Sequence, residues 1–243
     1  MKKIAILLVI ALFSTFAAFA ETDAYEPALL EGVVTGITEE GYLVYEDSLG
    51  EVMVLVNEDT AIEAASDIVC GDYVYVDYDG QMTRSIPAQI TATVLRMYKL
   101  EGEIVEHMPE DNSVMLNTAE HGDIIVRLPD DWADREITDT HLTVYFNGAM
   151  TMSLPAQIGA GLVIPGYSVS GIITEIADDY IVIGEEMSAI QVNITSEMLT
   201  EAIVEGAVVR VIYNGQMTRS VPAQINAISI DTIIPAAEEM DAQ

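Results

Sequence analysis

Residues 78–90 read YDGQMTRSIPAQI, and this phrase occurs three times in the 243-residue chain. It returns as FNGAMTMSLPAQI at residues 146–158 and as YNGQMTRSVPAQI at residues 213–225. The glycines of the three phrases lie 68 and then 67 residues apart. A fixed period of this kind is typical of a protein built from structural repeats. We therefore expect three copies of one folding unit, which cover residues 30–100, 101–167 and 168–234.

Each copy shows the pattern of short β-strands. In the third strand of the first copy, Val52, Val54 and Val56 alternate with other residues, which is typical of a half-buried strand. The Asp-Gly or Asn-Gly pair of each phrase indicates a tight turn after the fourth strand. The segment before that strand is variable and acidic, and in the third copy residues 196–203 favour a short helix that begins at Thr195 or Ser196.

The order of these elements resembles the OB-fold, a small five-stranded barrel. Three strands, a short variable or helical segment and two more strands follow one another in each copy. A glycine lies inside each first strand (Gly32, Gly102 and Gly171), and Gly71 and Asp72 precede the fourth strand of the first copy. The resemblance implies an all-β chain of three tandem OB-like barrels. A fold-level resemblance does not give a function.

The repeated phrase also resembles a repeat of exported proteins from Gram-positive bacteria, which has no assigned activity. The second copy departs from it, because Met152 stands where the other copies have arginine and Asp139 where they have the glycine before strand four. Residues 97–102 contain no Gly/Ser-rich or Pro-rich linker, so we expect a stiff array of barrels. Residues 235–243 are expected to form a disordered acidic tail.

The N-terminus has the three parts of a secretory signal peptide. Lys2 and Lys3 precede an apolar run, and the small residues Ala18 and Ala20 mark a cleavage site. The apolar run is too short for a stable membrane span. We therefore expect removal of residues 1–20, no membrane span in the mature chain, and a secreted or extracytoplasmic protein.

The chain is strongly acidic. Its formal net charge is −31, and removal of Lys2 and Lys3 would make the charge −33. Such a surface repels phosphate backbones, so we expect nucleic acid to be excluded as a partner. The same surface attracts basic partners and, weakly and diffusely, divalent cations. The acids are dispersed along the sequence, which favours a solvated surface.

The sequence offers no motif of an enzyme. Cys70, the only cysteine, aligns with turn positions in the other copies and is expected to be exposed. The spacing of His107, His121 and His141 matches no zinc site, and no phosphate loop or nucleophile–base order occurs. Trp132 is expected to cover the end of the second barrel. We therefore expect a non-enzymatic protein with no catalytic residue, no bound metal and no cofactor.

The loop that carries the repeated phrase supplies the candidate ligand-binding residues. In a functional interpretation, its hydroxyls and amide hydrogen-bond a ligand and its arginine binds a carboxylate. In a structural interpretation, these polar groups satisfy the loop's own backbone. The replacement of arginine by Met152 favours the structural interpretation, because the other residues persist. The candidates are Thr83, Arg84, Ser85 and Gln89; Thr151, Ser153 and Gln157; and Thr218, Arg219, Ser220 and Gln224.

Two functions fit these features. The first is an exported non-enzymatic binding or spacer protein that engages a protein or a component of the cell envelope. The alternative is a small-ligand or cation-binding protein, for example for calcium, that uses the loop between strands four and five of each barrel.

Overall fold

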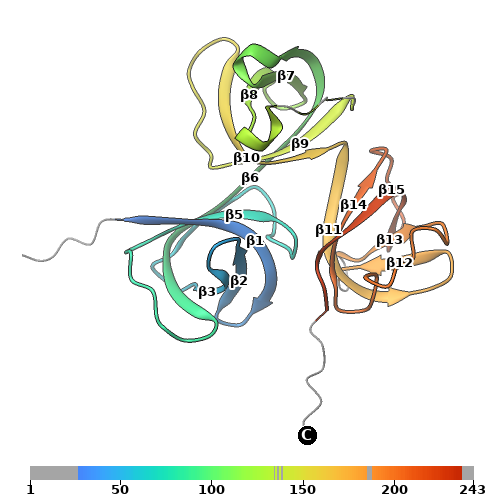
Figure 1. Cartoon of the computed structure of the whole chain (residues 1–243), viewed down its shortest axis with the longest axis horizontal. Coiled ribbons are helices and arrows are strands. Elements are labelled where there is room, and N and C mark those ends of the chain that lie inside the picture. Colours follow the sequence, from blue (N-terminus) through green and yellow to red (C-terminus); the bar gives the residue numbers. More distant parts are fainter. Residues whose placement is uncertain (1–26, 134, 136, 138, 185–187, 237–243) are drawn as a thin grey trace, which may run out of the picture.

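The computed structural model describes residues 27–133, 135, 137, 139–184 and 188–236. The expected signal peptide lies outside the described residues, as do residues 237–243 of the expected tail. The described chain forms three β-barrels that are arranged as three lobes around a common junction (Figure 1). Among these residues, no helix is long and apolar enough to cross a membrane.

In the first barrel, the first strand pairs antiparallel with the second and fourth strands, and the second strand pairs with the third. The fifth strand closes the barrel because it pairs antiparallel with the fourth strand and parallel with the third. These strands are β1 (Ala28–Thr38), β2 (Gly41–Glu46), β3 (Gly50–Leu55), β5 (Tyr73–Tyr78) and the first half of β6 (Ala88–Met108).

The other two barrels repeat this pairing. Barrel 2 consists of the second half of β6, β7 (Ser113–Thr118), β8 (Gly122–Arg127), β9 (His141–Phe146) and β10 (Ala156–Pro165). Barrel 3 consists of β11 (Tyr167–Ile176), β12 (Tyr180–Ile183), β13 (Ile190–Asn193), β14 (Val208–Tyr213) and β15 (Ala223–Ile234). The expected fold class, an all-β chain of three five-stranded OB-like barrels, is confirmed.

The variable segment before the fourth strand differs in each barrel. Barrel 1 has the short strand β4 (Ala61–Ala64), which pairs parallel with β6. Barrel 2 has the 3-10 turn η2 (Asp130–Trp132), in addition to η1 (Pro109–Asp111) between β6 and β7. In barrel 3, residues 196–203 form turns, so the expected helix is wrong. Ile203 of this segment is buried in the core of barrel 3. Turns place this side chain in the core without a helix.

Each barrel has its own apolar core, and the side chains of Cys70 and Trp132 pack in the cores of barrels 1 and 2. Trp132 is buried against the core of barrel 2, as expected for a cover, and the Arg135 guanidinium lies 5.0 Å from its ring centroid. Cys70 was expected to be exposed, and this is wrong, since it is only 5% exposed. The segment before β5 turns inward, so that Ile68 and Cys70 both pack on the core of barrel 1.

The barrels are joined without flexible linkers. β6 is a single strand of 21 residues that pairs within barrel 1 up to Met97 and within barrel 2 from Tyr98 onward. Only Gly166 separates β10 from β11. The core of barrel 1 also continues into its neighbours, because it contacts Tyr145 of barrel 2 and Val208 of barrel 3. The three lobes are therefore fixed to one another by chain continuity and by burial of apolar surface.

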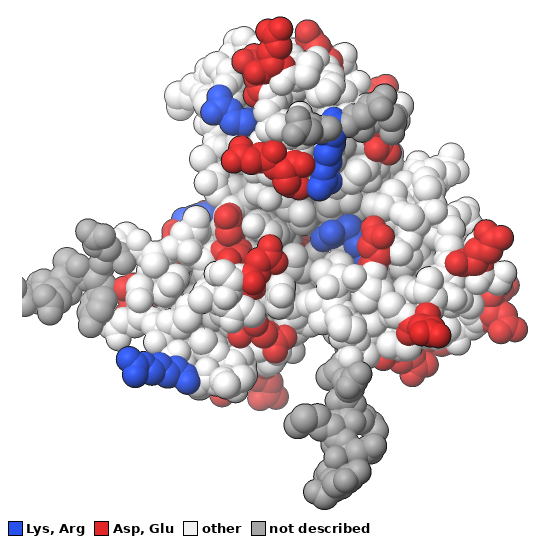
Figure 2. Space-filling model, viewed as in Figure 1, with Lys and Arg blue, Asp and Glu red and all other residues white. Residues whose placement is uncertain are grey.

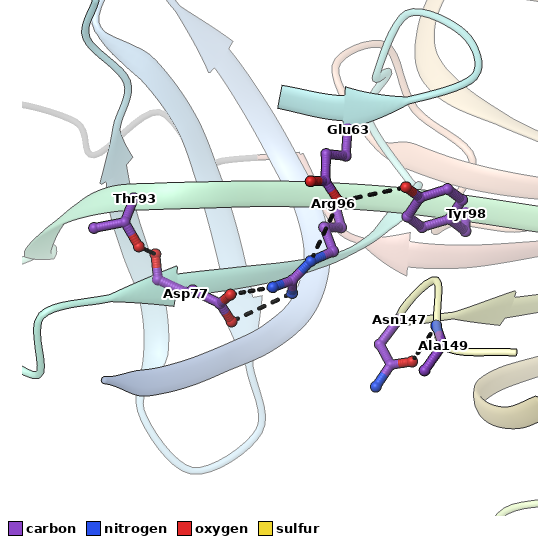
Figure 3. A network of polar contacts seen from close by, with 7 residues as sticks. All are labelled: Glu63, Asp77, Thr93, Arg96, Tyr98, Asn147 and Ala149. Carbon is purple, nitrogen blue, oxygen red and sulfur yellow. Dashed lines mark hydrogen bonds and ion pairs between the residues drawn. The ribbon is translucent and has the colours of Figure 1, made fainter. Parts of the chain in front are cut away.

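A polar network ties β4, β5 and β6 together where β6 passes from barrel 1 to barrel 2 (Figure 3). The Arg96 guanidinium makes two contacts with the Asp77 carboxylate, and its Nε lies 3.5 Å from a carboxylate oxygen of Glu63. The Tyr98 hydroxyl donates to the same Glu63 oxygen at 3.3 Å. The ring of Tyr98 in turn packs under Gly148, where an added Cβ would lie 2.5 Å from the ring.

Candidate functional site

The three repeated phrases form three loops with the same internal hydrogen bonds. We name them loop 1 (residues 79–87), loop 2 (residues 147–155) and loop 3 (residues 214–222). In loop 1, the Thr83 N–H donates to the Gln89 carbonyl at 2.9 Å, and the Gln89 N–H donates to the Thr83 hydroxyl at 2.8 Å. The hydroxyls of Thr83 and Ser85 lie 2.7 Å apart, and Ser85 donates to the Pro87 carbonyl at 2.7 Å.

Loops 2 and 3 repeat these bonds with their own threonine, serine and glutamine. In all three loops the peptide bond before the proline is cis. The candidate hydroxyls are thus hydrogen-bonded within the loops, to each other and to the loop backbone. The structure brings together the candidates of one loop but not those of different loops, because each loop extends outward from its own barrel (Figure 1).

The side chains that each loop presents to solvent are different ones. Ile86 in loop 1, Leu154 in loop 2 and Val221 in loop 3 are 101%, 98% and 83% exposed. Each of them directly precedes the proline, and two residues earlier the chain has Arg84, Met152 or Arg219. We call these three pairs of side chains the loop tips. Sequence reasoning missed the aliphatic members, although an apolar residue recurs there in all three phrases within an otherwise polar stretch.

Among the described residues, the two arginines of the loop tips form no ion pair with an acid. Within the described residues, neither Arg84 nor Arg219 lies within 4.0 Å of a carboxylate, whereas Arg96, Lys99 and Arg135 do. The chain has 40 acids and 9 basic residues, and Figure 2 shows acids on all three lobes. Loops 1 and 3 therefore pair an aliphatic side chain with a cation that is available to another molecule.

A groove lies at the base of two of the loops. In barrel 2 it measures about 670 Å³ and runs between Met108, Arg127, Met150 and Gln157. Its counterpart in barrel 1 measures about 260 Å³ and lies between Leu55, Met82 and Gln89. Met82 and Met150 line these grooves and also pack against the cores of barrels 1 and 2.

A buried polar cluster lies at the junction and not in the loops. The Asp72 carboxylate, 7% exposed, accepts the Tyr145 hydroxyl at 3.0 Å and the Val69 N–H at 2.9 Å. Burial raises the pKa of the Asp72 carboxyl, although these hydrogen bonds and the charges of Lys99 and Arg210 act in the opposite direction. Burial likewise raises the pKa of the Tyr145 hydroxyl. The cluster joins barrel 1 to barrel 2 through side chains.

This cluster occurs once, because the repeat does not supply it. Thr140 and Ala207 stand at the positions of Asp72 in the other copies. Arg210 of barrel 3 completes it by donating from Nη2 to the Gly71 carbonyl at 3.4 Å, and its buried Nε has no hydrogen-bond partner among the described residues. The repeated residues thus build barrels and loops, and unrepeated residues build the contacts between barrels.

The described residues contain no group of three or more His, Cys, Asp or Glu side chains placed to hold a metal ion. His107 and His121 are exposed, and His141 stacks on Tyr167 with ring centroids 4.6 Å apart. The three histidines therefore do not meet in one site.

Comparison with known proteins gives a likeness of structure alone. No protein-family model matches the chain, and a search of curated proteins finds no match. One similar solved structure is a multidomain protein with nucleic acid binding domains from Streptococcus pneumoniae, with 15% identity, coverage of 84% of this chain and 73% of that one, and a TM-score of 0.22. Another is Drosophila Unr CSD456, with 13% identity, coverage of 85% and 97%, and a TM-score of 0.19.

These neighbours correct one expectation. The expectation that nucleic acid is excluded as a partner is contradicted, because the first neighbour is described as having nucleic acid binding domains. The expectation rested on net charge, which describes the whole surface. A binding face depends instead on a few side chains, such as Arg84 and Arg219. Net charge alone therefore excludes no class of partner here.

Proposed function

We propose that the chain is an exported, non-enzymatic binding protein that engages a protein partner or a protein component of the cell envelope through its three loop tips. The observation that carries the proposal is the threefold repetition of one exposed side-chain arrangement. Each tip holds an aliphatic side chain almost fully in water, on a loop that its own hydrogen bonds fix in place. Arginine and methionine, which stand beside these aliphatic side chains, are enriched in protein–protein interfaces, and an exposed apolar side chain gains free energy when a partner removes it from water.

Fixed loops favour binding because little conformational entropy is lost when a partner docks. The junction adds to this advantage, since the three tips keep constant distances from one another when the barrels are fixed. One chain can then engage several partner molecules, and linked sites of this kind gain affinity from a high effective concentration. Three fixed tips on one chain suit a binding or spacing role, and such a role requires no catalytic group.

The proposal includes export. The N-terminal pattern of Lys2, Lys3, an apolar run and a cleavage site after Ala20 supports it, and so does the resemblance of the repeated phrase to exported Gram-positive repeats. The intact mass of protein recovered from outside the cell tests the point. Mature protein should begin at Glu21, and a mass that retains Met1 would contradict export with cleavage.

The experiment compares wild-type protein with two triple variants as bait for envelope proteins of the source cells. The tip variant carries Ile86→Ser, Leu154→Ser and Val221→Ser. The matched control carries Leu29→Ser, Leu49→Ser and Ile228→Ser, which change aliphatic side chains that are 53%, 51% and 60% exposed elsewhere on the barrels. All six positions are exposed, so both variants should keep the wild-type fold by circular dichroism.

We expect one partner to be recovered with wild type and control and lost with the tip variant. Equal loss with both triple variants would show general hydrophobic adhesion and would overturn the proposal. Recovery of nucleic acid in place of protein, removed by nuclease treatment, would overturn it as well.

A further inference from the structure

A second candidate site is a cleft between barrels 1 and 3, whose lining includes none of the loop-tip residues. The cleft measures about 470 Å³, which is within the range of small-molecule sites. Its apolar lining comes from both barrels, with Ile37, Val69 and Met97 on one side and Ile172 on the other. No single repeat could form it, because it exists only where the junction holds the two barrels together.

The charged groups of the cleft differ in their availability. The Lys99 ammonium is paired with the Glu101 carboxylate at 3.0 Å and donates to the Ser168 carbonyl at 3.2 Å. The Asp72 carboxylate is occupied by Tyr145 and Val69. Asp67 lines both the cleft and an adjoining groove beside Tyr42, is exposed, and makes no ion pair or side-chain hydrogen bond among the described residues. Among the described residues that line the cleft, the available charge is therefore the Asp67 carboxylate.

From this arrangement we propose that the cleft binds a small cationic amphiphile, with a primary ammonium group on the Asp67 carboxylate and an apolar chain between Ile37 and Ile172. An ammonium group donates three hydrogen bonds and pairs well with a carboxylate. The net charge of −31 concentrates cations at the surface and favours this headgroup over an anion. The apolar lining provides the gain in free energy from burying the chain.

The test measures binding of three probes with one tail, octylammonium, octanol and octanoate, by isothermal titration calorimetry below their critical micelle concentrations. Octylammonium should bind most tightly. Asp67→Asn should weaken octylammonium roughly tenfold, the loss expected for one charge-assisted hydrogen bond, and leave octanol unchanged. Ile37→Ser should weaken all three probes, because this residue, 53% exposed, contacts the tail.

Matched controls separate the cleft from the acidic surface in general. Asp59→Asn removes another exposed carboxylate, and Leu49→Ser removes another half-exposed aliphatic side chain. Neither residue lines the cleft. Both should bind octylammonium like wild type. If Asp59→Asn weakens binding as much as Asp67→Asn, the probe is held by diffuse charge and the site is overturned.

Two other results would also overturn the proposal. Tighter binding of octanoate than of octylammonium would identify Lys99 as the anchor, and the absence of saturable binding by all three probes would show that the cleft takes no amphiphile. The outcome does not depend on the function proposed for the loop tips, since the variant with three serines at the tips keeps the cleft intact.

Discussion

Ile90, Ile158 and Ile225 close the three repeated phrases, and their side chains are 2%, 4% and 1% exposed. Each begins the fifth strand of its barrel and packs in the core. Truncation of Ile90 to alanine should lower the free energy of unfolding by about 2–5 kcal/mol, the usual cost of a buried isoleucine. A barrel of this size has a small stability margin, so the loss should be visible as a lower melting temperature.

The matched change at the same loop is Arg84→Ala, which removes an exposed charge without an ion pair among the described residues. It should cost roughly 1 kcal/mol or less. Thermal melts of the two variants make the comparison. If Arg84→Ala melted as low as Ile90→Ala, the arginine would hold the loop, contrary to the hydrogen bonds that the structure shows.

A second prediction at the residue scale concerns Asp72. Burial raises the pKa of its carboxyl above the ordinary value of 3.8, so the folded protein binds this proton more tightly than the unfolded chain. Its contribution to stability is therefore fully present below pH 3.8 and is lost as the pH rises through the raised pKa. Asp72→Asn cannot ionise and keeps an oxygen that accepts the Tyr145 hydroxyl.

Melting temperatures of wild type and Asp72→Asn between pH 3.5 and 7 measure this contribution, because other carboxyls cancel in the difference. Wild type should lose stability relative to the variant as the pH rises. A difference that stays constant over this range, or that changes in the opposite direction, would show that the carboxyl keeps an ordinary or lowered pKa.

Alternation in the sequence predicted which side chains of repeated strands are buried, for example Val52 and Val54. It could not predict the burial of Cys70, because alignment of the copies compares only repeated positions and Cys70 faces a core that other parts of the chain complete. The exposure of Ile86 could not be predicted either, because an aliphatic side chain is expected in the core unless the loop conformation is known.

At the scale of elements, the three loops share one hydrogen-bond pattern, whereas the segment before the fourth strand differs in each barrel. Residues 196–203 show why that segment was hard to predict. Their apolar residues pack on the barrel from successive turns, and a short apolar run does not distinguish turns from a helical turn. The strands were predictable because their period of two repeats three times.

The loop hydrogen bonds lead to a prediction for Thr218→Val in loop 3. Valine is close in shape but loses the hydroxyl that accepts the Gln224 N–H and bonds Ser220. Each lost hydrogen bond is worth about 1 kcal/mol, so the loop should open more often while barrel 3 stays folded. Amide hydrogen exchange should accelerate at Gln224 and leave loops 1 and 2 unchanged.

The control is Thr174→Val, which removes an exposed hydroxyl of the same barrel that donates to the Gly184 carbonyl at 3.1 Å. Exchange at Gln224 should not change in this variant. If Thr218→Val also left that amide as protected as in wild type, the hydroxyl would not be what fixes the loop.

At the scale of the whole molecule, the barrels are held by residues that occur once. The sequence indicated a stiff array from the absence of linkers, but it could not indicate that Tyr145 would reach Asp72 or that Arg210 would reach Gly71. Such contacts depend on how the barrels rotate against each other, which no repeat pattern encodes. The cleft that Asp67 lines also depends on how barrels 1 and 3 are oriented relative to each other.

The last prediction tests this junction with two glycines in the left-handed region. Gly71 has a φ of +92°, and a Cβ there would lie 2.2 Å from the Cβ of Ser170 in barrel 3; Gly50 has a φ of +75°, and a Cβ there meets nothing within 4 Å. Alanine at either position carries a similar conformational cost of roughly 1–2 kcal/mol. Only Gly71→Ala also forces barrel 3 away from barrel 1.

Small-angle X-ray scattering should therefore show a larger radius of gyration for Gly71→Ala than for wild type, and an unchanged value for Gly50→Ala. Circular dichroism should show the same strand content in all three proteins, because each barrel keeps its own core. Barrel 3 is the lobe that moves, since only Gly166 joins it to barrel 2 by the chain, whereas β6 holds barrels 1 and 2 on one strand. An unchanged radius for Gly71→Ala would mean that the junction absorbs the added methyl group and that this contact does not fix the lobes.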